Sequence, residues 1–285
     1  MHEIITQKDF SAGIVLYNPD IDRLIENINA IESQCGFIFF VDNGSKNIDS
    51  IEKILENKGN IILIKNNENF GIAKALNQLL ELSHSHGYEW LLTLDQDSVA
   101  YPNLVEKYCA FLNEQNNEKI ISVTCNIVDR NFSVFNKINS EFEDIVYCIT
   151  SGNAIKVRPV IDISGFDDDM FIDKVDTDIC LNIKKHGFRI VQLNIDGVLH
   201  EIGHGKKIKL FFRDWEVYNH PAWRRYYMCR NAKYLKFKYH NRYVSKLVLK
   251  ERFHTFMVFV FENHKMEKLK QAIKGFKDAK KMIRR

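Results

Sequence analysis

The first hundred residues alternate short apolar runs with amphipathic stretches. The apolar runs predict strands over residues 11–17, 37–41, 61–64 and 90–94. Between these runs, apolar residues recur at helical spacing and predict helices over residues 21–31, 48–55 and 72–82. Continuous apolar strands that alternate with amphipathic helices are typical of a parallel sheet covered on both faces. The pattern therefore predicts an α/β fold.

The rest of the chain continues this pattern and then changes. Further apolar segments predict strands over residues 120–126, 145–150, 154–157, 189–193 and 197–200. Residues 177–186 predict a helix that ends before Gly187, a residue type suited to a helix C-terminus. From about residue 219 the pattern becomes one of long, basic helices rich in aromatic residues. We expect two domains, residues 1–210 and residues 211–285.

The composition fits a folded protein without a membrane-spanning segment. Of 285 residues, 45% are hydrophobic, which supplies a sizeable core and excludes wholesale disorder. No apolar run approaches the ~18 residues that cross a bilayer, and the first ten residues lack a signal-peptide core. The six cysteines form no CxxC pair, as expected for buried thiols in a reducing compartment. We therefore expect a cytoplasmic protein.

The net charge of +3 conceals a strong asymmetry. Residues 1–204 contain 17 Lys+Arg and 31 Asp+Glu, whereas residues 205–285 contain 23 Lys+Arg and 6 Asp+Glu. A basic region of this kind can bind an anionic membrane, a phosphorylated substrate or a nucleic acid. Alternatively, it packs against the acidic part of its own chain. No RRM, KH, zinc-finger or helix-turn-helix pattern accompanies it, so we expect no nucleic-acid partner.

Polar residues follow the predicted strands. Ligands of open α/β sheets bind at the carboxyl ends of the strands, so these residues mark the expected site. Asp95 and Asp97 form a DxD pair whose oxygens suit Mg²⁺ or Mn²⁺ bridging a diphosphate. Asp42 can accept hydrogen bonds from a nucleobase or ribose, and Gly71 opens a helix where an anion can approach. Taken singly, each segment also fits an ordinary turn or helix start.

Two common nucleotide-binding motifs are absent from the sequence. No GxGxxG follows the first predicted strand, and no GxxxxGK[ST] occurs anywhere. The chain is therefore neither a Rossmann dehydrogenase nor a P-loop NTPase.

Several ordered segments together resemble the inverting glycosyltransferases of family 2. The segments Tyr17-Asn18-Pro19, Val41-Asp42-Asn43-Gly44-Ser45, Asn69-Phe70-Gly71-Ile72-Ala73-Lys74-Ala75-Leu76-Asn77 and Asp95-Gln96-Asp97 carry this resemblance. Later segments resemble the bacterial rhamnosyltransferase branch of the family. These lie at residues 150–153, 165–167, 170–178, 199–203 and 220–231.

The resemblance implies a GT-A fold, with a Rossmann-like, mostly parallel central sheet and flanking helices, followed by the basic helical C-terminal region. It also implies a nucleotide-diphosphate sugar as donor. The donor-binding residues would include Leu16, Tyr17, Asp42, Asn69, Gly71, Lys74, Asp95 and Gln96. Asp97 and His200 would hold the metal, Mn²⁺ or Mg²⁺, and the acceptor-binding residues would be Ser151, Gly152 and Asp173.

Inverting transfer also needs a carboxylate that takes a proton from the acceptor hydroxyl. The resemblance places this base at Asp176, with Asp178 close by. The usual Glu-Asp pair reads Val175-Asp176 here, so Asp173, Asp176 and Asp178 all stay open for this role. The competing interpretation is that Asp176 or Asp178 caps a helix.

Basic residues near the end of the chain have two interpretations. Arg224 and Arg230 lie on one predicted helix, and their guanidinium forks suit a diphosphate, or alternatively pair with acidic residues of the same protein. Beyond them, apolar residues recur among lysines and predict an amphipathic helix for an anionic leaflet. The same helix fits packing within its domain or a homodimer. Its apolar residues are Met266, Leu269, Ile273, Phe276 and Ile283.

The sequence thus predicts an inverting glycosyltransferase, and the resemblance implies that it moves rhamnose from dTDP-rhamnose to a glycan or polyprenyl-diphosphate-linked acceptor in cell-surface polysaccharide synthesis. It would work in the cytoplasm or at the inner face of the plasma membrane. The alternatives are a UDP-sugar-dependent transferase and a non-catalytic nucleotide-sugar-binding subunit. A sugar-1-phosphate nucleotidyltransferase is disfavoured because residues 11–20 lack the Gly- and Arg-rich loop expected of one.

Overall fold

The computed structural model describes residues 4–56, 58–130, 134–135, 137–200, 206–210, 213–217 and 219–284. The chain divides into two compact units. The sheet unit comprises Met1–Asp168 and Ile179–Glu201, and the helical unit comprises Asp169–Asp178 and Ile202–Arg285. The helical unit therefore contains a short acidic segment from the middle of the chain as well as the C-terminal region. The boundary at 210/211 stays a prediction.

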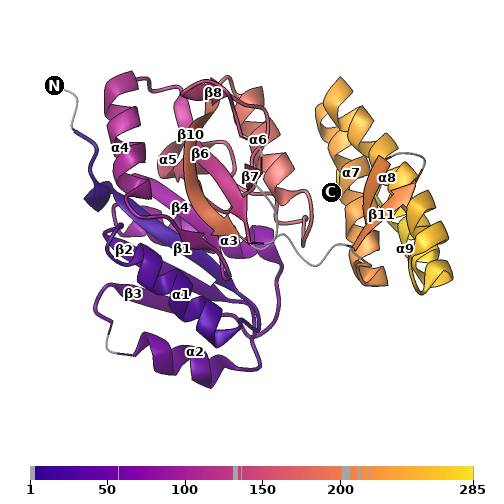
Figure 1. Ribbon diagram of the computed structural model, residues 1–285, viewed down its shortest axis with the longest axis horizontal. Coiled ribbons are helices and arrows are strands. Elements are labelled where there is room, and N and C mark those ends of the chain that lie inside the picture. The colour runs from indigo at the N-terminus through magenta and orange to yellow at the C-terminus, as the bar shows by residue number, and fades with distance from the viewer. Residues whose placement is uncertain are drawn as a thin grey trace. The chain divides into compact units, whose positions relative to one another are not determined.

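One ten-stranded sheet forms the centre of the sheet unit (Figure 1). Along its main path the strand order is β3-β2-β1-β4-β9-β6-β10-β5, with β7 beside β6 and β8 beside β10. The strands are β1 (Phe10–Leu16), β2 (Phe37–Asp42), β3 (Ile61–Lys65), β4 (Trp90–Asp95), β5 (Val99–Ala100), β6 (Ile120–Asp129), β7 (Val134–Phe135), β8 (Phe142–Asp144), β9 (Asn153–Lys156) and β10 (Arg189–His200).

Strands β1 to β4 pair in parallel, as do β6 and β10, and β9 runs antiparallel between β4 and β6. The carboxyl ends of β1, β2 and β4 therefore meet at one edge. This architecture confirms the predicted α/β fold with a central sheet and flanking helices. The sheet is mixed and not mostly parallel, because β5, β7, β8 and β9 all pair antiparallel with their neighbours. The helices of this unit are η1 (Gln7–Asp9), α1 (Ile21–Ile31), α2 (Ile48–Leu55), α3 (Ile72–Ser85), α4 (Leu104–Gln115), α5 (Val157–Asp162) and α6 (Val175–Lys185), whose first turn belongs to the helical unit.

Helices cover both faces of the sheet. Successive strand residues point to opposite sides, and because the strands are apolar throughout, both faces must be buried. On β1, Ile14 lies in the main core, which also contains Leu24 of α1 and Tyr108 of α4. The opposite face of β1 contacts α3, where the Ser11 hydroxyl donates a hydrogen bond to the hydroxyl of Ser83 (2.9 Å). The continuous apolar runs of the sequence therefore reflect strands buried on both sides.

Two strand predictions need correction. Residues 145–150 form no strand, because β8 runs antiparallel to β10 and has nearly reached the first residue of β10 when it ends. Asp144 lies opposite Val191, and the Ile145 N–H donates to the Ile190 carbonyl, one residue after β10 begins. Cys148 is nevertheless buried, which explains the apolar pattern of this segment. The predicted strands at 189–193 and 197–200 are one strand, β10, whose register with β6 shifts around Asp196.

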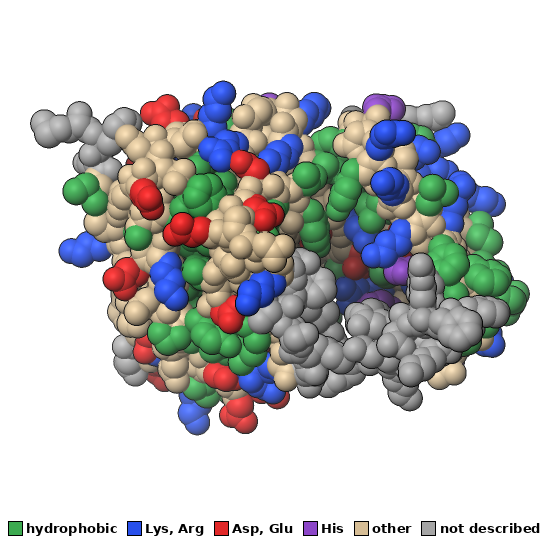
Figure 2. Space-filling model, turned by 45° about the horizontal axis from the view of Figure 1, so that its top comes forward, with side chains coloured by type: hydrophobic (Ala, Val, Ile, Leu, Met, Phe, Trp, Pro, Cys, Tyr) green, Lys and Arg blue, Asp and Glu red, His purple; other side chains and the backbone are tan. Residues whose placement is uncertain are grey.

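Three helices dominate the helical unit: α7 (Ala222–Tyr239), α8 (Arg242–Phe261) and α9 (Lys265–Asp278). They are followed by the single turn η2 (Met282–Arg284) and preceded by a hairpin of β11 (Lys206–Leu210) and β12 (Arg213–Val217). In Figure 2, blue Lys and Arg side chains gather over this unit, and red Asp and Glu side chains are concentrated over the sheet unit. Within the described residues, no helix has the length and apolar character needed to span a membrane.

Helices α7 and α9 pack backbone to backbone. A Cβ atom on Gly275 of α9 would lie 2.3 Å from the carbonyl oxygen of Tyr226 on α7. Ala272 of α9 and Ala279, directly after the helix, are both fully buried. Small residues in the second half of α9 thus accompany its close approach to α7.

Candidate active site

The loops after β1, β2 and β4 are joined by hydrogen bonds at the carboxyl edge of the sheet. The Tyr17 backbone N–H donates to the Gln96 side-chain oxygen (2.9 Å), which ties the first loop to the loop after β4. The Asn18 N–H donates to the Ser45 hydroxyl (2.7 Å), which ties it to the loop after β2. The structure therefore brings together Tyr17, Gln96 and the Asp42 loop, as the carboxyl-end rule predicts.

Asp42 is buried at the end of β2 with half of its carboxylate unused. It is 1% exposed, and its Oδ2 accepts the backbone N–H groups of Gly44 (3.0 Å) and Ser45 (2.9 Å). Its Oδ1 has no hydrogen-bond partner among the described residues. Buried acceptors of this kind are rare and often mark a ligand or water position.

The loop after β3 joins the same edge. The Asn43 side chain donates to the Gly71 carbonyl (3.1 Å), and the Asn69 side-chain oxygen accepts the Gly71 N–H (2.9 Å). Gly71 directly precedes α3 and has φ +89°. Residues with a Cβ atom seldom adopt this backbone conformation. Lys74 is exposed on the first turn of α3, where its ammonium lies 4.4 Å from the centroid of the Phe70 ring.

Asp95, Asp97 and His200 form a cluster suited to a metal ion. One ligand atom from each residue lies within 4.8 Å of the other two. His200 Nε2 lies 3.7 Å from Asp95 Oδ2, and His200 Nδ1 lies 3.7 Å from Asp97 Oδ1. Two carboxylates and an imidazole are a donor set that divalent cations such as Mn²⁺ accept. The residues present therefore fit a divalent metal.

A buried set of hydroxyls supports this cluster. His200 Nδ1 is hydrogen-bonded to the Ser98 hydroxyl (2.9 Å), which leaves Nε2 available as a metal ligand. The Ser151 hydroxyl donates to Ser98 (2.7 Å) and accepts the Asp95 backbone N–H (3.2 Å). From α1, the side chain of Asn27 donates to the carbonyls of Asp95 (2.9 Å) and Ser98 (2.6 Å). The DxD turn is therefore held from three directions.

Three residues predicted to bind substrate are buried in the sheet unit. Leu16 lies in the hydrophobic core, and the Ser151 hydroxyl is engaged with Asp95 and Ser98. The Gly152 carbonyl accepts the Tyr108 hydroxyl (2.7 Å). Their donor-binding and acceptor-binding roles stay predictions, and the contacts seen are those of supporting residues.

The acidic segment Asp169–Asp178 is bound to α7 within the helical unit. Arg224 pairs with Asp173 through Nε–Oδ2 and Nη2–Oδ1 distances of 3.2 Å each. Arg230 donates to the Asp169 carbonyl (2.7 Å), and Asn231 donates to the Asp173 carbonyl (2.8 Å). Arg224 thus pairs with an acidic side chain of its own protein, as the alternative interpretation of these arginines expects. Arg230 contacts a backbone carbonyl of the same acidic segment.

Asp176 and Asp178 share the first turn of α6 but differ in environment. Asp178 is 1% exposed, and its carboxylate pairs with Lys238 (2.9 Å) and accepts the Tyr239 hydroxyl (2.8 Å). Asp176 is partly exposed, and its Oδ1 accepts the Thr177 backbone N–H (2.7 Å). Asp176 is therefore the more accessible of these two carboxylates.

All six cysteines are free and buried, in agreement with the sequence. Burial raises the pKa of the thiols of Cys109 and Cys125 to about 12 and that of Cys229 to about 11. Thiols with such pKa values are protonated near neutral pH, and a protonated thiol is a poor nucleophile. These three cysteines are therefore not suited to covalent catalysis.

Sequence reasoning missed Asn27 and Ser98. Asn27 could have been found, since it is a polar residue on the buried face of α1, beside Leu24, Ile28 and Ile31. Ser98 gave no such signal because its partner His200 comes from β10, far along the chain.

Comparisons with known proteins agree with this architecture. The sequence model of glycosyl transferase family 2 matches residues 11–156, about half of the chain. A relative named dTDP-rhamnosyl transferase RfbF, from Shigella flexneri, is 28% identical in an alignment of 283 positions, and the alignment covers 92% of each chain.

Solved structures share the fold at low sequence identity. S. aureus TarS residues 1–349 match with a TM-score of 0.59 and 15% identity, covering 95% of this chain and 80% of that one. GalNAc-T7, solved with UDP, GalNAc and Mn²⁺, matches with a TM-score of 0.62 and 13% identity over 100% of this chain. This chain spans 57% of the GalNAc-T7 chain and 37% of a longer TarS chain. The chain belongs to glycosyl transferase family 2 and is a glycosyltransferase with a GT-A-like fold.

Proposed function

We propose that this protein is an inverting transferase that moves rhamnose from dTDP-rhamnose to a glycan acceptor. The observation that carries the proposal is the Asp95–Asp97–His200 cluster at the carboxyl end of β4, beside the loops that surround Asp42. The choice of donor is supported by the Shigella flexneri dTDP-rhamnosyl transferase, which aligns along 92% of both chains.

Asp42 is proposed to recognise the base of the donor. Its Oδ1 lacks a partner among the described residues and can accept the imide N–H that thymine and uracil share. Tyr17 is half exposed, in the loop that the Asn18–Ser45 hydrogen bond ties to the Asp42 loop, and its ring is of a kind on which a base can stack. This arrangement fits dTDP and UDP sugars, and dTDP is preferred here because of the named relative.

Asp97 and His200, with Asp95, are proposed to hold a divalent cation. A bound cation supplies charge stabilisation for the departing diphosphate. The residues of this chain orient that site: Ser98 fixes the His200 ring, and Asn27 holds the DxD turn. Asp97 therefore acts on donor binding rather than on the proton of the acceptor.

Asp176 is proposed as the base. In a single displacement the acceptor oxygen bonds to the anomeric carbon while the bond from that carbon to the diphosphate oxygen breaks. The acceptor proton passes to a carboxylate, and the configuration at carbon inverts. The family resemblance favours Asp176, and its carboxylate is partly exposed at the start of α6, whereas Asp178 is buried.

Nucleotide binding tests the donor site. We expect dTDP with Mn²⁺ to raise the melting temperature more than UDP, GDP or CDP does, because dTDP is the nucleotide of the proposed donor. The shift should be measurable, since a ligand at about 100 times its Kd adds about 2.7 kcal/mol of stability. Asp97→Ala should lose the metal-dependent part of this shift. Glu81→Ala, which removes an exposed carboxylate from α3, is the matched control and should keep it.

Each result of this panel has a definite meaning. A larger shift with UDP identifies a UDP-sugar-dependent transferase. Equal shifts in Asp97→Ala and Glu81→Ala contradict the metal site. Nucleotide binding in this panel, together with no sugar transfer to any acceptor in a separate activity assay, would identify a non-catalytic nucleotide-sugar-binding subunit.

We further propose that the helical unit contacts an anionic bilayer through α8, which fits an acceptor carried on a polyprenyl diphosphate. Four apolar residues at helical spacing are exposed on α8: Leu249 (61%), Phe253 (42%), Phe256 (61%) and Val260 (40%). Exposed Lys246 and Lys250 lie on the same side of the helix. Exposed aromatic residues beside lysines are typical of helices that lie in the bilayer interface.

The surface predicted on α9 and the turn after it is exposed in part. Met266, Ile273 and Ile283 are exposed, whereas Leu269 and Phe276 are partly buried. A second copy of this chain is a poorer partner for α8, because residues 205–285 of both copies carry the same excess of positive charge.

Vesicle sedimentation tests this surface. We expect binding to vesicles of phosphatidylcholine with phosphatidylglycerol and weak binding to phosphatidylcholine alone. Phe253→Ser with Phe256→Ser should weaken binding at least tenfold, because burying one Phe side chain contributes about 2 kcal/mol. The matched control is Met266→Ser with Ile273→Ser on α9, which should bind like the wild type. Equal losses in both pairs, or self-association that depends on Phe256, would contradict the assignment.

A further inference from the structure

The residues just before α6 have an unusual backbone. Asp173 and Lys174 are consecutive, neither is glycine, and their φ angles are +66° and +68°. Left-handed backbone is unfavourable for residues with a Cβ and persists where surrounding contacts impose it. These two residues lead directly into the first turn of α6, which carries Asp176.

Contacts from α7 hold the first of the two residues. The Asp173 carboxylate pairs with Arg224, and the Asp173 carbonyl accepts the Asn231 side-chain N–H (2.8 Å). Asn231 also donates to the Ile172 carbonyl (2.8 Å), so one fully buried amide fixes two successive peptide units.

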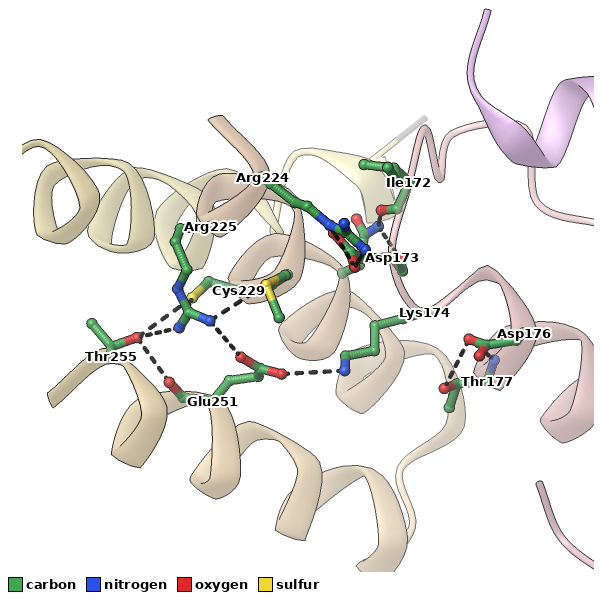
Figure 3. Close-up of polar contacts among 12 residues, drawn as sticks. Ile172, Asp173, Lys174, Asp176, Thr177, Arg224, Arg225, Cys229, Glu251 and Thr255 are labelled. Atoms are coloured by element: carbon green, nitrogen blue, oxygen red, sulfur yellow. Dashed lines mark hydrogen bonds and ion pairs between the residues drawn. The ribbon is translucent and has the colours of Figure 1, made fainter. Parts of the chain in front are cut away.

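A buried carboxylate on α8 holds the second residue. The Lys174 ammonium lies 3.2 Å from Glu251 Oε1, and Figure 3 shows the Lys174 side chain extending from the segment toward α8. Glu251 is 1% exposed, and its Oε2 lies 3.4 Å from Arg225 Nη1. Arg225 is 3% exposed and donates to the Thr255 hydroxyl (3.0 Å).

One buried carboxylate thus lies between two cations. Burial lowers the pKa of Lys174, but Glu251, Asp176 and Asp173 more than offset it and hold that pKa above its ordinary value. Lys174 is therefore charged at neutral pH. Buried ion pairs add little net stability compared with apolar packing, so a role in fixing one conformation accounts better for this arrangement.

We propose that Glu251 is a positioning residue for Asp176. Through Lys174 it holds the left-handed pair that sets where α6 begins, and with it the place of the Asp176 carboxylate. Lys174 also interacts electrostatically with Asp176, so the network acts on the charge of that carboxylate as well as on its place. This inference rests on the proposed function, in which Asp176 is the base.

Kinetics of Glu251→Gln test the inference. A misplacement of about 1 Å can cost 10²-fold in rate, so we expect kcat to fall by about 10- to 100-fold, with the donor KM unchanged. A cation close to Asp176 favours its ionised form, so displacement of Lys174 should move the acidic limb of the kcat–pH profile to higher pH. Lys174→Met serves as a second variant, because it leaves the Glu251–Arg225 pair in place, and should give the same kinetic pattern.

Glu262→Gln is the matched control. Glu262 is also a buried carboxylate of the helical unit, paired with the buried Lys268 at 2.8 Å. No contact described for Glu262 reaches the Asp169–Asp178 segment, so this variant should lower the melting temperature and leave kcat and its pH profile unchanged. Equal kcat losses in Glu251→Gln and Glu262→Gln would overturn the inference.

A double variant separates this inference from the proposed function. If Glu251 acts through Asp176, Glu251→Gln should lower kcat little further in an Asp176→Asn background. Full multiplicative losses in that background would overturn the positioning role. Wild-type kcat in Asp176→Asn would instead overturn the base assignment in the proposed function.

Discussion

We expect Asp176→Asn to lower kcat by about 10³-fold, because it would remove the proposed general base, and a general base usually contributes 10²- to 10⁴-fold. Asparagine has nearly the same shape and can still accept the Thr177 N–H, so the start of α6 should keep its structure. The donor contacts proposed here lie on other residues, so the Kd for the nucleotide sugar should not change. Single-turnover transfer and calorimetric donor binding measure the two quantities.

Asp169→Asn is a suitable control, since it alters an exposed carboxylate of the same segment and spares the carbonyl that Arg230 contacts. It should retain kcat within a few-fold. If Asp176→Asn transfers sugar at the wild-type rate while Asp173→Asn or Asp178→Asn does not, the base is one of those residues.

We expect Gly275→Ala to lower the unfolding free energy by about 3 kcal/mol, at the upper end of the usual cost of an added methyl group in a packed interior. The new Cβ would lie 2.3 Å from the Tyr226 carbonyl oxygen, so α7 and α9 must separate. Backbone atoms cannot rotate away as the end of a side chain can. Urea denaturation measures the change.

The control is Gly59→Ala. A Cβ on Gly59 would meet no atom within 4 Å. Its effect on stability should be small, with a slight gain from the reduced freedom of the unfolded chain. A loss in Gly59→Ala as large as that in Gly275→Ala would show that the α7–α9 contact is not the cause.

The elements that could be predicted are those whose signals are local. The helices over residues 21–31 and 48–55 were predicted with the bounds of α1 and α2, because amphipathic spacing lies within each helix. The segment 145–150 was predicted wrongly, because strand formation depends on which edge is available to pair with. The apolar pattern of this segment indicates that its side chains are buried. It does not indicate whether its backbone has a neighbouring strand to pair with.

The candidate site also contains residues that could be predicted from local signals and residues that could not. Asp95 and Asp97 could be placed at a sheet edge from the order of strands and turns, and the resemblance added His200. Lys174 and Glu251 carried no signal, because neither residue type nor spacing indicates a buried ion pair between distant segments. Their contact depends on how α8 packs, which no local pattern specifies.

The acidic segment within the helical unit has a consequence for the order in which the protein is made. Residues 169–178 leave the ribosome before α7 and α8 exist, so their left-handed backbone must wait for partners that are synthesised later. Domains of nascent chains generally fold from the N-terminus. A chain that stops before Glu251 would retain every proposed donor-site residue of the sheet unit and lack the buried carboxylate that pairs with Lys174. Ordering of the turn that carries the proposed base would therefore be among the last events of its biogenesis.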